Sequence, residues 1–437
     1  MTAVTLVLTN CTTYDALPLP KSASLASSLS ELHSSDGAVP ARLKVADVAF
    51  LALNNNPDLR ATRAQHGLAQ AQILQAGIPP NPSLTGALLP LVAGPGTVTA
   101  YNVGISYNFK SLLTLSNRRR SAEAAAGQID AQILWQEWQT VGQARLLAVD
   151  LIQADRSYRL VVEARDVLSK RVARAREAVA SGNATFGTLA PDVTALQALQ
   201  VQAADLARLQ LQRRHQLNAL LGLMPDVVVP LADRPELPPY DGAAALANLP
   251  DIVRRRPDLV ALEFGYASQD EKVRAAIVAQ FPNLTIGITG GSDNSEVRNL
   301  GPQITLELPL FDRNQGNVAI ERSTRQKLHD EYAARLAATD AQVRAMVSEI
   351  TLLTTQLDIA ERDAVAIRRA TAAAATEFDD GNLDERSYID LITARVAKEL
   401  EILTLQQSLL DQQVAIATIL GAGMKPLRMS QSGGVAP

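Results

Sequence analysis

Side chains that commonly carry enzymatic chemistry are few and widely spaced in this chain. Its histidines and its single cysteine fall in none of the spacings that hold a metal ion or activate a nucleophile: they are His33, His66, His215, His329 and Cys11. No GxxxxGK[ST] phosphate loop and no GxSxG nucleophile elbow occurs in the 437 residues. We therefore expect no catalytic residues, no metal centre and no cofactor.

Cys11 suggests a different chemistry, the attachment of lipid. Leu8-Thr9-Asn10-Cys11 is similar to a degraded bacterial lipobox, in which the cysteine becomes the acylated first residue. The stretch before Cys11 is apolar, as in a secretory signal, but it lacks positive charges, so this prediction requires a translation start upstream of Met1. The alternative is an incidental cysteine in a mobile N-terminus. Residues 1–42 are predicted to form a lipid anchor and tether.

Composition excludes several classes of protein. Lys and Arg number 41 and Asp and Glu number 45, which gives a net charge of −4 without a clustered basic face. Nucleic acid is therefore not expected as a partner. Hydrophobic residues reach 47%, too many for a disordered chain. No run approaches the roughly 18 apolar residues of a membrane-spanning helix.

The chain contains an internal duplication, so each helix and strand that positions other residues is expected twice. Four short motifs recur in the same order at offsets of 199 to 202 residues: Asn56-Pro57-Asp58-Leu59 and Arg256-Pro257-Asp258-Leu259, Pro80-Asn81 and Pro282-Asn283, Ser181-Gly182-Asn183 and Asp380-Gly381-Asn382, and Leu221-Gly222 and Leu420-Gly421. We expect two repeats, at 43–224 and 251–421, joined by a proline-rich linker at 225–250. Residues 422–437 are expected to be a disordered tail.

Each repeat is predicted to contain a β-hairpin with one apolar and one polar face. Partner stretches for the hairpins lie at 83–92 and 284–289. The second strand of each hairpin alternates apolar residues with mostly polar or small ones. The apolar positions are Val103, Ile105, Tyr107 and Phe109 in the first hairpin and Ile304, Leu306, Leu308 and Leu310 in the second.

Long helices flank these hairpins. Helix is predicted over 43–77 and about 257–280 before them, and over about 118–180 and 314–378 after them. A return helix follows each long one, and the first is expected to start near Pro191. Five heptads in the second long helix indicate a coiled coil, with core positions Leu336, Thr339, Val343, Met346, Ile350, Leu353, Leu357, Ala360, Ala364 and Ile367.

Two architectures can use these hairpins. A membrane barrel needs strands of about 9–11 residues with an apolar outer face, and four strands per chain would require three chains to close twelve. A soluble, half-buried sheet shows the same alternation, so periodicity leaves both open.

The order of the segments resembles the outer-membrane efflux (TolC-type) family. Similar motifs occur throughout 43–421: ALNNNPDLRATRAQ, RRRPDLVALE, FPNLTIG and LPLFDRNQGN, the last being similar to members that serve heavy-metal efflux. The resemblance implies a mixed all-α and membrane-β fold, in which a long coiled-coil α-barrel joins a twelve-stranded outer-membrane barrel formed by a trimer. It also implies a passive exit duct in the outer membrane of a Gram-negative bacterium, extending into the periplasm.

The resemblance further suggests a periplasmic gate made of aspartates. Residues 388–394 (YIDLITA) match the pattern that follows the second turn in the family, with Asp390 in the first acidic position and Thr393 replacing the second. The other carboxylates at this turn either line the entrance or solvate the loop: Asp379, Asp380 and Asp384. Residues 387–390 also have the pattern of a capping box, so Asp390 is a gate residue, a helix cap or both.

Exposed turns between the rods are the expected contact with a periplasmic adaptor (membrane fusion) protein, which would link the duct to an inner-membrane pump. The candidate contact residues are Ser181, Gly182, Asn183, Gly381 and Asn382. The exported cargo would be metal ions or small toxic compounds. The alternatives are a duct for protein secretion and, in a different class, a soluble coiled-coil periplasmic adaptor, which would have one helical hairpin per chain.

Overall fold

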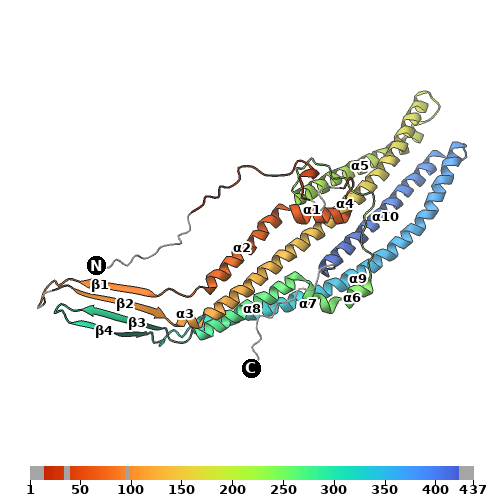
Figure 1. Cartoon of the computed structure of the whole chain (residues 1–437). Coiled ribbons are helices and arrows are strands. Elements are labelled where there is room, and N and C mark those ends of the chain that lie inside the picture. Colours follow the sequence, from red (N-terminus) through yellow and green to blue (C-terminus); the bar gives the residue numbers. More distant parts are fainter. Residues whose placement is uncertain (1–13, 34–39, 95, 97, 423–437) are drawn as a thin grey trace.

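The computed structural model describes residues 14–33, 40–94, 96 and 98–422. The molecule is strongly elongated, with a small β-sheet at one end and two helical hairpin tips at the other (Figure 1). Among the described helices, none combines the length and apolar character needed to cross a bilayer.

The first repeat contains a helix pair, a β-hairpin and a long helical hairpin. Its elements are α1 (Val45–Asn55), α2 (Pro57–Gly77), β1 (Ser83–Leu89), β2 (Ala100–Asn108), α3 (Lys110–Leu113), α4 (Leu115–Ala180) and α5 (Phe186–Leu221). The helix predicted over 43–77 is broken at Asn56, whose side chain accepts a 2.9 Å hydrogen bond from the Leu59 amide and so caps α2. The expected start near Pro191 is also wrong, because α5 begins five residues earlier and contains this proline.

The second repeat has a similar order of elements, without a counterpart of α3. A 3₁₀ turn at Leu29–Glu31 precedes the first repeat, and the linker contains α6 (Gly242–Ala247) and a 3₁₀ turn that begins at Leu249. The second repeat then contains α7 (Ile252–Arg255), α8 (Pro257–Val278), β3 (Leu284–Ser292), β4 (Arg298–Leu306), α9 (Gln315–Asp379) and α10 (Glu385–Ile419). The two long helices, α4 and α9, have 66 and 65 residues, which at about 1.5 Å per residue makes each of them close to 100 Å long.

The four strands form one antiparallel sheet in the order β1-β2-β3-β4, so the β2–β3 pairing joins the two repeats. The register collects the apolar side chains on one face. One row across the sheet consists of Leu84, Ile105, Ile288 and Pro302. Polar and small residues occupy the opposite face, where Thr289 donates a 2.8 Å hydrogen bond to Asn102.

The strands are shorter at two ends than the alternation predicts. β1 ends at Leu89, directly before Pro90, and β4 ends at Leu306, before Leu308 and Leu310. Proline at 90 and at 309 offers no amide hydrogen to a neighbouring strand, so neither stretch continues the ladder.

The predicted coiled coil is confirmed in α9. All ten heptad positions between Leu336 and Ile367 are buried or half-buried, and α9 packs along α10. In the part of the rod that leads to the tips, neighbouring helices follow the order α5, α4, α10 and α9. This part of the chain is therefore a wall one helix thick.

The recurring Pro-Asp-Leu motif has different roles in the two repeats. In the second, Arg256 donates 2.7 and 2.6 Å hydrogen bonds to Asp258 and one of 2.8 Å to Thr339 on α9, while its guanidinium lies 4.9 Å from the Trp135 ring of α4. This buried cluster holds α8, α9 and α4 together. In the first repeat the equivalent Asp58 is exposed.

Candidate functional site at the helical tips and in the helical wall

The two helical hairpins end in turns of the same geometry. Gly182 and Gly381 both have φ of +76°, which favours glycine because a side chain would be strained there. The following residues, Asn183 and Asn382, each donate an amide hydrogen bond to a carbonyl five residues earlier, at 2.8 and 2.7 Å. These hydrogen bonds terminate α4 and α9 in the same way. The predicted contact residues at both turns are exposed.

Asp384 is the residue that caps α10. Its carboxylate accepts hydrogen bonds from the amide and the hydroxyl of Ser387, at 2.9 and 2.6 Å. These hydrogen bonds hold the pKa of Asp384 below its usual value. A cap at Ser387, the alternative explanation for Asp390, is therefore wrong: α10 begins two residues before Ser387, and Asp390 is an exposed residue one turn further along.

A buried arginine joins the two hairpins near these turns. Arg171 of α4 forms ion pairs with Asp192 of α5, at 3.1 Å, and with Glu385 of α10, at 2.6 Å. Its guanidinium also lies 4.2 Å from the ring centre of Phe378, which is stacked on Tyr388. We call these five residues the tip cluster. It links all four long helices.

The tip cluster contains more carboxylate than its single arginine neutralises. Asp192 is fully buried. Its burial, together with the hydrogen bond to the Glu385 carboxyl, raises the pKa of Asp192 to about 6, against the opposing effect of Arg171. Asp192 therefore titrates within reach of ordinary conditions.

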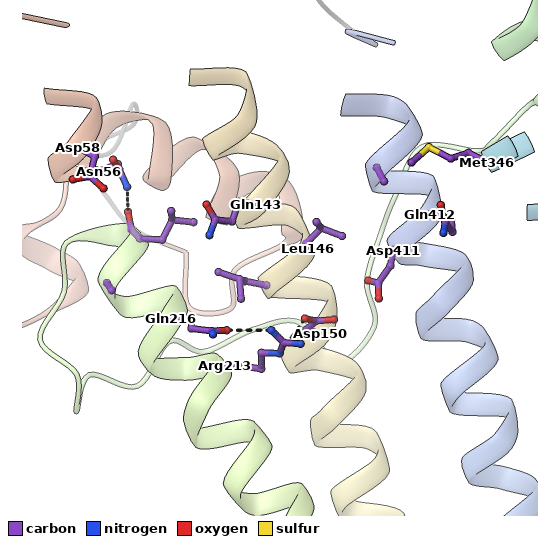
Figure 2. Close-up of a pocket in the computed structure, with 14 residues that line it drawn as sticks. Asn56, Asp58, Gln143, Leu146, Asp150, Arg213, Gln216, Met346, Asp411 and Gln412 are labelled. Carbon is purple, nitrogen blue, oxygen red and sulfur yellow. Dashed lines mark hydrogen bonds and ion pairs between the residues drawn. The ribbon is translucent and has the colours of Figure 1, made fainter. Parts of the chain in front are cut away.

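A second polar cluster lies midway along the wall, at a cavity of about 770 Å³ between α5, α4 and α10 (Figure 2). One carboxylate oxygen of Asp150 on α4 forms an ion pair with Arg213 of α5 at 3.2 Å, and the other accepts a 2.8 Å hydrogen bond from Gln407 of α10. Asp411 of α10 points toward Asp150 across the cavity. Burial, followed by repulsion from Asp150, raises the pKa of Asp411 to about 7, although Arg213 opposes this.

Comparison with known proteins agrees with this architecture. The model of the family described as "Outer membrane efflux protein" matches residues 248–422. The probable efflux pump outer membrane protein SepC of Pseudomonas putida is 23% identical over 412 residues, covering 85% of this chain and 82% of that protein. The cobalt-zinc-cadmium resistance protein CzcC of Cupriavidus metallidurans is 22% identical over 365 residues, covering 79% and 81%. The resemblance of this chain to outer membrane efflux proteins is thereby confirmed.

The solved structures that resemble this chain show the same fold. The outer membrane channel CmeC of Campylobacter jejuni superimposes with a TM-score of 0.72 at 16% identity, covering 95% of this chain and 96% of that one. The predicted fold class is thereby confirmed: a mostly helical chain with a four-stranded antiparallel sheet, of the TolC type and consistent with a trimeric barrel. The predicted location agrees with the names of these relatives, which are outer membrane proteins.

Sequence reasoning found the turns and missed the clusters. Asp379 and Asp380 are exposed at the end of α9 and belong to neither of the two clusters. Cys11 lies outside the described residues. The missed residues are Arg171, Asp192 and Glu385 at the tip and Asp150, Arg213 and Asp411 in the wall. The one available signal was the presence of charged residues at positions where the helices otherwise bury apolar side chains, such as Asp192 beside Leu189 and Leu196.

Proposed function

We propose that three copies of this efflux protein form a passive duct through the outer membrane. The observation that carries this proposal is the exposed apolar face of the sheet. Leu84 is 76% exposed, Leu300 80% and Ile304 67%, whereas the other face is polar. An apolar face that meets lipid and a polar face that meets water are what a membrane barrel requires.

Closure of the barrel requires further chains. Within the described residues, β1 and β4 each pair on one side only. An unpaired strand edge in lipid leaves backbone groups without partners, so each β1 is expected to pair with the β4 of a neighbouring chain. Twelve strands from three chains would close the ring.

The edges of the helical wall support the same arrangement. Large apolar side chains are exposed on α2 and α5, at one edge, and on α9, at the other: Leu68, Leu74 and Val201 face away from their own chain, as do Ile320 and Leu352. We expect the α2 and α5 edge of one chain to pack against α9 of the next.

In the working assembly, the helical tips would contact a periplasmic adaptor, which in turn would hold an inner-membrane pump. The exposed turns at Ser181-Gly182-Asn183 and Gly381-Asn382 are the proposed contact sites. Asp390 is the proposed gate residue, with Asp379, Asp380 and Asp384 nearby. The family and fold are those of ducts, and we propose that this chain performs no catalysis.

The pump would decide what crosses the duct. SepC belongs by name to an efflux pump, and CzcC by name to cobalt, zinc and cadmium resistance. Small toxic compounds and metal ions are therefore both proposed cargoes, with protein secretion as the alternative. We also propose that the two repeats, 43–224 and 251–421, are the structural units and that Cys11 is acylated, which mass spectrometry of the mature protein would test.

The proposal is tested by mass and by conductance. Detergent-extracted protein should behave in light scattering as three chains of 46.7 kDa, about 140 kDa after subtraction of detergent, and it should form ion-conducting channels in planar bilayers. A monodisperse monomer that needs no detergent would contradict the duct.

A further inference from the structure

We propose that the cavity between α5, α4 and α10 binds an organic ammonium ion, with Asp411 accepting its N–H hydrogen bonds. The lining combines carboxylates with apolar surface: Asp58, Asp150 and Asp411 lie with Leu146, Leu147 and Met346. A volume of about 770 Å³ lies within the range of small-molecule sites, roughly 300–1,000 Å³.

The cavity presents acceptors that lack donors. Asp150 is satisfied on both oxygens by Arg213 and Gln407. Oδ1 of Asp411 and Oε1 of Gln412 are buried and have no hydrogen-bond partner among the described residues. Buried acceptors are normally paired, so two orphans in one cavity indicate a missing donor. An ammonium group carries up to three N–H donors.

The charges favour a cation over a neutral donor. Three carboxylates face the cavity, one each from α2, α4 and α10, and Arg213 of α5 is the one basic residue in the lining. Asp411 itself is held partly protonated by burial and by Asp150, with a pKa of about 7. A bound cation would replace that proton and compensate the charge.

The remaining lining favours an organic ion over a metal ion. Leu146, Leu147 and Met346 offer an apolar surface that a bare ion would not use. No group of three or more His, Cys, Asp or Glu residues with metal-binding geometry occurs in the described part of the chain. A protonated amine with a hydrophobic body fits both halves of the cavity.

The cavity and the linker lie on different faces of the wall. Ile152, Asp155 and Arg159 of α4 line a smaller pocket together with the linker residues Ala232 and Asp233, and Arg159 pairs with Asp233 at 3.8 Å. These three residues lie about 140–180° around the helix from Asp150. In the proposed trimer the linkers would fill the duct if they lay inside it. The cavity is therefore expected to face the duct, a step that rests on the proposed function.

Calorimetry of the detergent-extracted full-length protein tests the site, with 2-phenylethylamine as the probe and 2-phenylethanol as its neutral analogue. The amine should bind at pH 8 and the alcohol at least tenfold more weakly. With a pKa of about 7, Asp411 is about 90% ionised at pH 8 and about 10% at pH 6, so amine affinity should fall about tenfold between them while the amine stays protonated.

Asp411→Asn should reduce amine affinity at least tenfold and abolish its pH dependence. Asp166→Asn is the matched control: Asp166 is exposed on α4, 16 residues from Asp150, and binding should not change. Ala415→Phe should fill the cavity and abolish binding with every charge intact, which keeps the test valid if Asp411→Asn does not fold.

Equal binding of amine and alcohol, or unchanged binding by Asp411→Asn or Ala415→Phe, would overturn the ammonium site. Bilayer conductance separates this result from failure of the duct. Amine binding without ion conductance would support the ammonium site and contradict the duct. Ion conductance without amine binding would support the duct and contradict the ammonium site.

Discussion

Arg171 lies over Phe378 at 4.2 Å, which places a cation from the first hairpin on an aromatic ring at the end of the second. This contact, with the ion pairs to Asp192 and Glu385, connects the two hairpins near their tips, where Ile389 of α10 also packs in one apolar cluster with α4 and α5. If the proposed duct opens at this end, opening would have to disrupt the tip cluster.

Removal of Arg171 should loosen the tips. Arg171→Ala leaves Asp192 buried without its cation, and breaking a buried ion pair costs about 3–5 kcal/mol. Hydrogen exchange of amides in 165–192 and 378–392 should become faster, and bilayer conductance should rise. Arg174→Ala, at an exposed position on the same helix, should change stability by less than about 0.5 kcal/mol. Equal behaviour of the two variants would contradict a latch at Arg171.

Acidification should tighten the tips. The packed state raises the pKa of Asp192 from 3.8 to about 6, so it binds a proton more strongly than the open state does. Tip packing should therefore weaken as pH rises from about 4 through 6 and stay weaker above that. Hydrogen exchange, corrected for its intrinsic pH dependence, would show this. Asp192→Asn should remove the dependence, and a dependence that persists in this variant would assign it to other groups.

Loss of Asp390 should widen the proposed gate. Three such carboxylates about 6 Å apart around one axis would repel one another by roughly 3 kcal/mol per pair at an effective dielectric constant of 20. Asp390→Ala should increase single-channel conductance and weaken block by divalent cations added from the periplasmic side. Asp226→Ala, at an exposed linker position, should do neither. Unchanged conductance and unchanged divalent-cation block in Asp390→Ala would show that Asp390 is not a gate residue.

The two faces of the sheet should differ in their tolerance of charge. Ile105→Lys places an ammonium on the proposed lipid face, at a cost of about 2–4 kcal/mol near the bilayer centre. Ser106→Lys, at the next position, places the same group on the proposed water face. Recovery of trimer from outer membranes should fall sharply for the first variant and little for the second. Equal recovery would indicate that the sheet does not face lipid.

Local patterns predicted much of this fold because its elements are long and regular. The heptads of α9 and the alternation of β2 each depend on neighbours within one segment. The ends of elements were less predictable, since Pro191 lies inside α5 and Asp384, not Ser387, caps α10. Charged residues at apolar helix positions could mark single members of the clusters but not which residues meet: Arg171 and Glu385 are 214 residues apart, and only the packing of α4 beside α10 brings them together.

The pairing of β2 with β3 joins the repeats through eight residue pairs, Tyr101↔Ser292 to Asn108↔Thr285, much as the hairpins pair within each repeat. The two repeats are thus joined by the same antiparallel strand pairing that we expect between chains. A ring built on this rule does not need the linker for closure. An ancestor of half the present length could have closed the same barrel as a hexamer, and duplication would then have halved the number of subunits and let the two tips diverge.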